Sequence, residues 1–153
     1  EWLLKGKPSL LGAASGAVAG LVCITPAAGF VDAGGALILG LIAGVVCYWG
    51  ATSLKHKLKY DDSLDAFGVH GIGGILGSVL VAVFGTNAIA GGAVQPMFEQ
   101  LKIQLIATGA TVVYALVGTA IILKVVQLLV GLRVTEEQER EGLDIALHGE
   151  HVD

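Results

Sequence analysis

Long apolar runs dominate the chain, and short polar segments separate them. A helix needs about 20 mostly apolar residues to cross the hydrocarbon core of a bilayer. The pattern predicts four such helices, at about 10–25, 36–54, 66–84 and 101–132. Pro26 is expected to end the first helix, because a proline disfavours helix in the residue before it. The fourth, at 1.5 Å per residue, would be about 48 Å long, so its end should emerge from the membrane.

Positive charge lies on one side of this predicted arrangement. The loops 26–35 and 85–100 contain no Lys or Arg. If the N-terminus is cytoplasmic, the asymmetry satisfies the positive-inside rule and the C-terminus is also cytoplasmic. The sequence therefore predicts a multi-pass protein of the cell (inner or plasma) membrane, with lipid around it. The residues assigned to the inner side are Lys5, Lys7, Lys55, Lys57, Lys59, Arg133 and Arg140.

Composition supports an all-α integral membrane fold. The chain is 54% hydrophobic and 14% charged, whereas soluble domains carry about 25% charged residues. No basic patch suited to nucleic acid is present. Cys23 and Cys47 lie inside apolar runs and are interpreted as small packing residues.

Glycine is abundant and regularly spaced, with 23 in the chain. Small residues four apart lie on one helix face and allow close backbone approach in membranes. Three of the four predicted helices carry such a stripe, which predicts a compact bundle. The stripes are Gly12, Gly16 and Gly20; Gly40 and Gly44; and Gly73 and Gly77.

The segment 133–153 is acidic and differs from the predicted membrane-spanning segment 1–132. Thr135 and Gln138 have the spacing of a capping box, and Gly142 is a suitable helix terminator. We expect about two turns of helix followed by an irregular end. His148 and His151 are three residues apart but have no third ligand nearby, so we predict an exposed pair and no metal site.

His70 is the most informative residue for function. It lies about one turn inside the third predicted helix, and an ionisable residue within a span is a functional hypothesis by default. A neutral imidazole can both donate and accept, so it could pass a hydrogen bond along a pore or relay a proton. A core histidine bonded to a backbone carbonyl is an equally strong interpretation.

Other polar residues have simpler interpretations. Asp65 is at the start of the third helix, where an N-cap is favoured over a transport role. Asp61 and Asp62 are expected to balance the nearby lysines on a solvated loop, and His56 should face solvent. The sequence contains no arrangement typical of an enzyme, and nothing in it calls for a cofactor.

Several stretches resemble the ammonium transporter (Amt) family. They are 1–12, 16–22, 25–29, Asp65-Ala66-Phe67-Gly68-Val69-His70-Gly71, and, in the tail, 131–144 and 148–150. The resemblance covers nearly the whole chain and is weakest in the loop 86–100. It implies the family's eleven-span fold and homotrimer, of which this chain would be spans eight to eleven and the cytoplasmic tail. The residues 1–5 look like mid-protein sequence, so we expect a piece of a longer protein.

The resemblance also implies roles for individual residues. His70 matches the second of the family's paired pore histidines, and Asp65 matches an acidic position near the inner mouth of the pore. Val18, Ala66 and Phe67 match positions near the pore or its walls. Because Val18 and Ala66 are small for those places, the pore here is expected to be slightly wider. The first histidine, the external recruitment site and the phenylalanine gate would lie in the other seven spans.

The tail resembles the region that docks on the inner face and helps to receive a PII-type nitrogen-regulatory protein. Its matched residues include Arg133, Gly142, Leu143, Asp144 and His148. The leading functional hypothesis is transport of ammonium or ammonia through a narrow hydrophobic pore. The alternatives are an ammonium sensor that signals through the tail and a structural membrane subunit without a pore.

Overall fold

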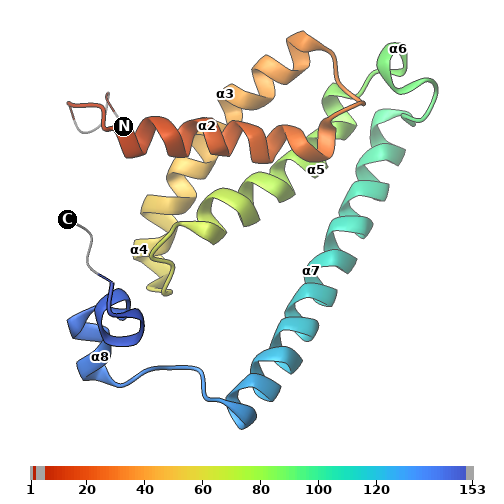
Figure 1. Ribbon diagram of the computed structural model, residues 1–153. Helices are drawn as coiled ribbons and strands as arrows, with labels where there is room; N and C mark the ends of the chain where they lie inside the picture. The colour runs from red at the N-terminus through yellow and green to blue at the C-terminus, as the bar shows by residue number, and fades with distance from the viewer. Residues whose placement is uncertain (1, 3–5, 151–153) are drawn as a thin grey trace. The chain divides into compact units, whose positions relative to one another are not determined.

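The computed structural model describes residue 2 and residues 6–150, and within these residues it contains helices and no β-strand (Figure 1). Among the described residues, four helical segments are long and apolar enough to cross a membrane: Leu10–Ala27, Ala33–Leu58, Phe67–Phe84 and Met97–Leu129. They overlap the four predicted helices, although the fourth runs from Met97 to Leu129 and not over 101–132. The chain divides into two compact units, Glu1–Ala110 and Thr111–Asp153.

Helix starts are fixed by side-chain caps. Helix α2 (Leu10–Ile24) begins after Ser9, whose hydroxyl accepts a hydrogen bond from the Gly12 amide at 2.9 Å. Helix α3 (Ala33–Trp49) begins after Asp32, whose carboxylate accepts from the Gly35 amide at 2.7 Å. The Asp32 cap explains why α3 begins three residues before the predicted start, since an Asp at this position satisfies an otherwise unpaired amide.

Helix α2 ends at Ile24 with Thr25 as its C-cap, which agrees with the prediction that Pro26 ends the first helix. Pro26 itself lies in a short 3₁₀ turn, η1 (Thr25–Ala27), which follows α2. Proline is tolerated in the first turn of a new helical segment, where its missing N–H costs little.

Two of the apolar segments change their helical pitch near one end. Helix α3 passes into the π-helical segment η2 (Gly50–Leu54) and then α4 (Lys55–Leu58), which ends at Lys59 with a positive φ of 54°. The third apolar segment begins with another π segment, η3 (Phe67–Gly71), and continues as α5 (Ile72–Phe84). The short helix α6 (Asn87–Ala90) then leads to α7 (Met97–Leu129).

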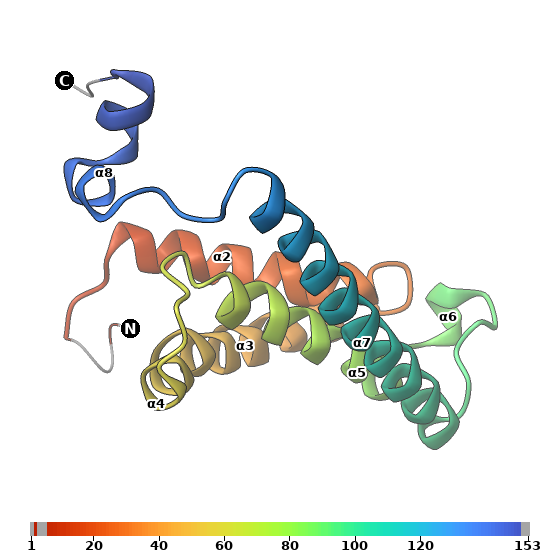
Figure 2. The same ribbon diagram turned by 90° about the horizontal axis from the view of Figure 1, so that it is seen from below.

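The core lies where α2, α3 and α5 contact one another (Figure 2). Cys23 and Cys47 are both buried, as expected for packing residues. Helix α7, in contrast, buries only Gln100 within the described part of the chain. The buried residues form two clusters, one of Cys23, Ala27, Val31, Leu39, Ala43 and Val81, and one of Ala19, Cys47 and Val69.

The loop after η1 and the loop after α5 are joined by backbone pairing. Val31 and Gly85 form an antiparallel bridge, and the Thr86 amide donates to the Phe30 carbonyl at 2.8 Å. The C-terminal ends of α2 and α5 therefore lie at the same end of the unit. This agrees with the predicted alternation, in which the segments 26–35 and 85–100 share one side.

The second unit contains the C-terminal segment. Helix α8 (Glu136–Glu141) has the predicted capping box between Thr135 and Gln138, and Gly142 follows it with a φ of 99°. The next residues are not irregular as expected, because Asp144–His148 form a π turn, η4. The Ala146 amide donates to the Gly142 carbonyl at 2.9 Å, which carries helical bonding past the glycine.

Candidate functional site at the two π segments

The two π segments η2 and η3 pack directly against each other. A Cβ added to Gly68 would lie 2.7 Å from the backbone N and Cα of Ala51, and one added to Gly50 would lie 3.1 Å from the Gly68 carbonyl oxygen. The Cys47 thiol also lies 3.7 Å from the Val69 carbonyl oxygen and donates to it. Single π turns within α-helices occur frequently at functional sites. Here the π segment η3 contains His70.

The start of η3 is capped by Asp62. Its carboxylate accepts hydrogen bonds from the amides of Ala66 at 2.7 Å and Phe67 at 2.9 Å. The prediction that Asp65 caps this helix is therefore wrong, and Asp62 forms the cap instead. Asp65 has a φ of 54°, and this left-handed backbone directs the chain so that Asp62, three residues earlier, reaches the free amides.

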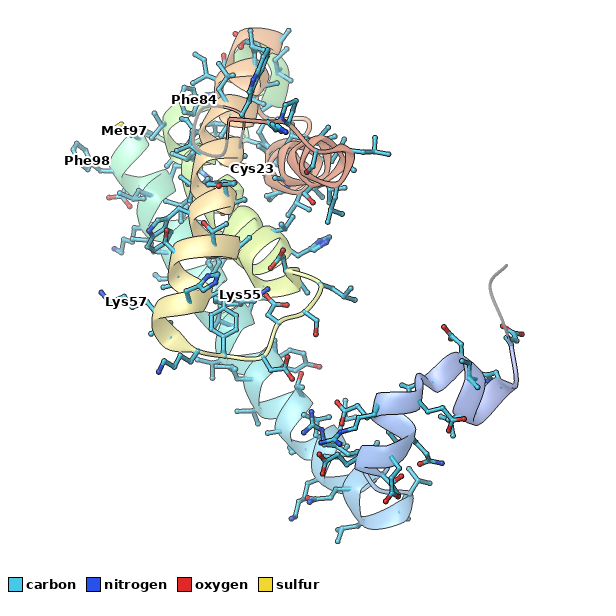
Figure 3. The ribbon with its side chains drawn as sticks, turned by 90° about the vertical axis from the view of Figure 1, so that its left-hand side faces the viewer. Cys23, Lys55, Lys57, Phe84, Met97 and Phe98 are labelled. Carbon is cyan, nitrogen blue, oxygen red and sulfur yellow. The ribbon has the colours of Figure 1, made fainter. Side chains whose placement is uncertain are left out.

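Asp65 instead forms an ion pair with Lys55. The Lys55 Nζ donates to Asp65 Oδ1 at 2.7 Å, and the two side chains are 27% and 40% exposed. In Figure 3, Lys55 is directed toward the loop before η3, whereas Lys57 extends away from the bundle. The pair therefore joins the end of α3 to the residue that precedes the third apolar segment.

Phe67 is held between an aromatic ring and a glycine. Its ring meets the Tyr60 ring edge-on, with the centroids 5.6 Å apart. A Cβ added to Gly71 would lie 2.7 Å from Phe67 Cδ2, so the ring rests over that glycine. Phe67 remains 49% exposed, and Ala66 is also exposed.

His70 follows these constrained residues but is itself exposed in this chain. Within residues 6–150 no hydrogen bond is formed by its ring. The preceding residue, Val69, packs with Ala19 of α2. Val18, next to Ala19, is 37% exposed. Val18 and His70 thus each adjoin a member of the same buried cluster and each present an uncovered side chain.

The tail residues lie in the second unit. Arg133 is 3.9 Å from Glu139, and Arg140 donates to Glu136 at 2.6 Å. Asp144 and His148 are exposed on the π turn η4, and Leu143 is 46% exposed. His151 lies outside the described residues. Within them, no group of three or more His, Cys, Asp or Glu side chains is arranged to hold a metal ion.

Sequence reasoning missed the residues that hold η3 in place. Gly50 and Gly68 belong to none of the stripes recognised by four-residue spacing, and Tyr60 was not considered. The one signal available for Lys55 was its place as the first charge after a long apolar run, ten residues before Asp65. Such a charge at a helix end needs either solvent or a partner.

A family model described as Ammonium Transporter Family matches residues 1–152. The chain belongs to the ammonium transporter family. It is 47% identical over 154 residues to the ammonium transporter of Bacillus subtilis and 48% identical over 149 residues to the ammonium transporter Amt1 of Archaeoglobus fulgidus. These alignments cover 98% and 96% of this chain but only 38% of each relative.

Solved structures agree with this assignment. The fold is similar to the crystal structure of Candida albicans Mep2, with a TM-score of 0.77 and 31% identity over 90% of this chain and 32% of that one. It is also similar to a structure described as a sensor Amt protein, with a TM-score of 0.81 and 27% identity over 95% of this chain and 36% of that one. Both likenesses cover most of this chain and agree with its membership of the family.

Proposed function

We propose that the protein containing this chain moves ammonium or ammonia across the cell membrane through a narrow hydrophobic pore, and that His70 lines that pore. Family membership carries the proposal, because the relatives similar over nearly all of this chain are named ammonium transporters. The chain spans slightly more than a third of the length of these relatives. The complete pore, its trimeric assembly and its entrance are thus properties proposed for the whole protein.

The environment of His70 supports its proposed role. An exposed imidazole without a partner among the described residues keeps both ring nitrogens available, one as donor and one as acceptor. An ammonia molecule that has lost its hydration shell needs such partners in an apolar passage. Phe67, Ala66 and Val18 supply exposed apolar surface on the same unit, and the ion-paired Asp65 would lie toward the inner mouth.

The experiment that tests this role is His70→Ala in the full-length protein, assayed by uptake of labelled methylammonium into proteoliposomes. We expect at least about a fivefold change in rate or in discrimination between ammonium and methylammonium, because one lost hydrogen bond to a desolvated substrate costs on the order of 1–3 kcal/mol. His56→Ala is the matched control, since His56 is exposed and its ring Nδ1 lies 2.7 Å from the Thr52 carbonyl oxygen. Equal uptake and selectivity in all three proteins would remove His70 from the mechanism.

We propose further that residues 133–153 form a cytoplasmic regulatory tail able to engage the inner face or a PII-type protein. Exposed apolar residues support this proposal, because Leu143, Ile145 and Leu147 are 46%, 39% and 51% exposed on so short a segment. Binding of a purified PII-type protein to the full-length protein, with and without a Leu143→Ser substitution, tests it. Unchanged binding would exclude Leu143 from the contact.

A sensor is the second candidate function, supported by the likeness to the structure described as a sensor Amt protein. The two functions differ in whether ammonium uptake or a downstream response depends on the protein. Uptake by purified protein in vesicles, with no other component present, would favour transport. A response to ammonium in cells that persists after uptake is abolished would favour sensing.

A further inference from the structure

We infer that Lys55 is a positioning residue for His70: its ion pair with Asp65 fixes the π segment η3 against η2 and so fixes where the imidazole lies. This inference rests on the proposed function, because it assigns Lys55 to the same transport site. Lys55 lies one residue beyond η2, and Asp65 lies two residues before η3. The pair thus closes the loop between the two π segments.

The contacts between the two segments are local and lie next to the ion pair. Asp62 holds the first amides of the third apolar segment, and Tyr60 contacts the Phe67 ring. The Tyr60 hydroxyl also reaches the Gly50 carbonyl at 3.5 Å. The contacts of Asp62 and of the Tyr60 ring join residues 60–62 to residues 66–67, shortly before His70, and the Tyr60 hydroxyl joins the same loop to η2.

The glycines at this interface let the two segments approach closely. Gly68 packs against the backbone of Ala51, and Gly50 packs against the Ile72 side chain and the Gly68 carbonyl. A close-packed interface of this kind transmits a displacement of one segment to the other. The Lys55–Asp65 pair at 2.7 Å is a polar tether at the end of this interface, and it joins the residue after η2 to the loop that leads into η3.

Burial indicates why the tether acts at this end. The opposite end of α5 is packed into the buried cluster of Cys23, Leu39 and Val81 and is joined to the first loop by the Val31–Gly85 bridge. At the η3 end the buried cluster consists of Ala19, Cys47 and Val69. With fewer buried apolar side chains there, the ion pair carries a larger share of the local free energy.

The variants that test the inference are Lys55→Met, which removes the charge, and Lys55→Arg, which restores it. Lys57→Met is the matched control, because Lys57 is an exposed lysine two residues away that extends from the bundle. Each is made in the full-length protein. Hydrogen–deuterium exchange of the peptide covering 66–71 is measured first, and ammonium-to-methylammonium discrimination in proteoliposomes second.

We expect Lys55→Met to raise exchange at 66–71 about twofold to fivefold, as for loss of one partly exposed ion pair, and to leave exchange at 76–84 unchanged. Discrimination should change by a similar factor. Lys55→Arg and Lys57→Met should behave as the wild type. In a His70→Ala background, Lys55→Met should have no further effect on discrimination, because a residue that acts through His70 has nothing left to position.

Two results would overturn the inference. One is equal exchange at 66–71 in Lys55→Met and Lys57→Met. The other is a discrimination change for Lys55→Met that persists in full in the His70→Ala background. If His70→Ala alone leaves transport unchanged, the proposed role of His70 fails, and the exchange measurement still decides whether Lys55 holds η3.

Discussion

The glycines of α5 and those of α3 have the same spacing but different surroundings. A Cβ added to Gly77 of α5 would collide with the Cys23 carbonyl oxygen and the Pro26 ring, and one added to Gly73 would lie 3.1 Å from Cys47 Sγ. For Gly40 and Gly44 of α3, no described atom outside the helix's own backbone lies within 4 Å of an added Cβ. The four-residue spacing of glycines therefore indicates which helix faces allow close approach. Which of these faces packs against a neighbouring helix depends on the tertiary structure.

The largest effect is expected for Gly77→Ala. The new methyl group meets the backbone of α2, which cannot rotate away as a side chain can, so we expect a loss of about 3 kcal/mol in stability, at the upper end for overpacking. Thermal unfolding of the purified full-length protein in detergent measures this. A variant with an unchanged midpoint would mean that α2 and α5 are not in backbone contact at Gly77.

An intermediate effect is expected for Gly142→Ala. This substitution tests the cost of an unfavourable backbone conformation without any steric collision. No described atom lies within 4 Å of a Cβ added there, but the φ of 99° is one that only glycine adopts easily. The substitution should cost about 1–2 kcal/mol. That cost should appear as faster hydrogen exchange in 136–148, with the unfolding of the membrane-spanning part unchanged. Normal exchange in the tail would contradict the glycine conformation after α8.

The smallest effect is expected for Gly44→Ala, the matched control for Gly77→Ala. In open space the methyl group meets nothing, and alanine is favoured over glycine within a helix by about 0.5–1 kcal/mol. The unfolding midpoint should stay the same or rise slightly. A strong destabilisation would instead locate a close contact between this face of α3 and a part of the protein outside these 153 residues.

Apolar patterning was sufficient to predict the four helices, and Thr135 and Gln138 were sufficient to predict the capping box. Both depend on local chemistry that adjacent residues carry. The two π segments were not predictable, because nothing in the residues 50–54 or 67–71 distinguishes them from ordinary helix. They are seen where Gly50 and Gly68 bring the two backbones together, which is a contact between distant residues.

Near His70, local spacing assigned the helix cap to the wrong carboxylate. Asp62 and Asp65 are both plausible caps by residue type. Because the backbone at Asp65 is left-handed, the Asp62 carboxylate accepts from the free amides at the start of η3, and the Asp65 carboxylate pairs with Lys55. That backbone conformation depends on how the ten-residue loop from Lys55 to Asp65 closes. It therefore cannot be predicted from the few residues around Asp65.

A π turn holds one more residue than the α-helical turn it replaces, so η3 can be regarded as a one-residue insertion. Deleting one residue between 67 and 71 would restore α-helical pitch, and everything before it would rotate by about 100° relative to α5. Asp65 would then move away from Lys55, which continues from α3, whereas Asp62 would move together with the amides that it caps. The length of this segment is therefore as much a part of the site as the identity of its residues.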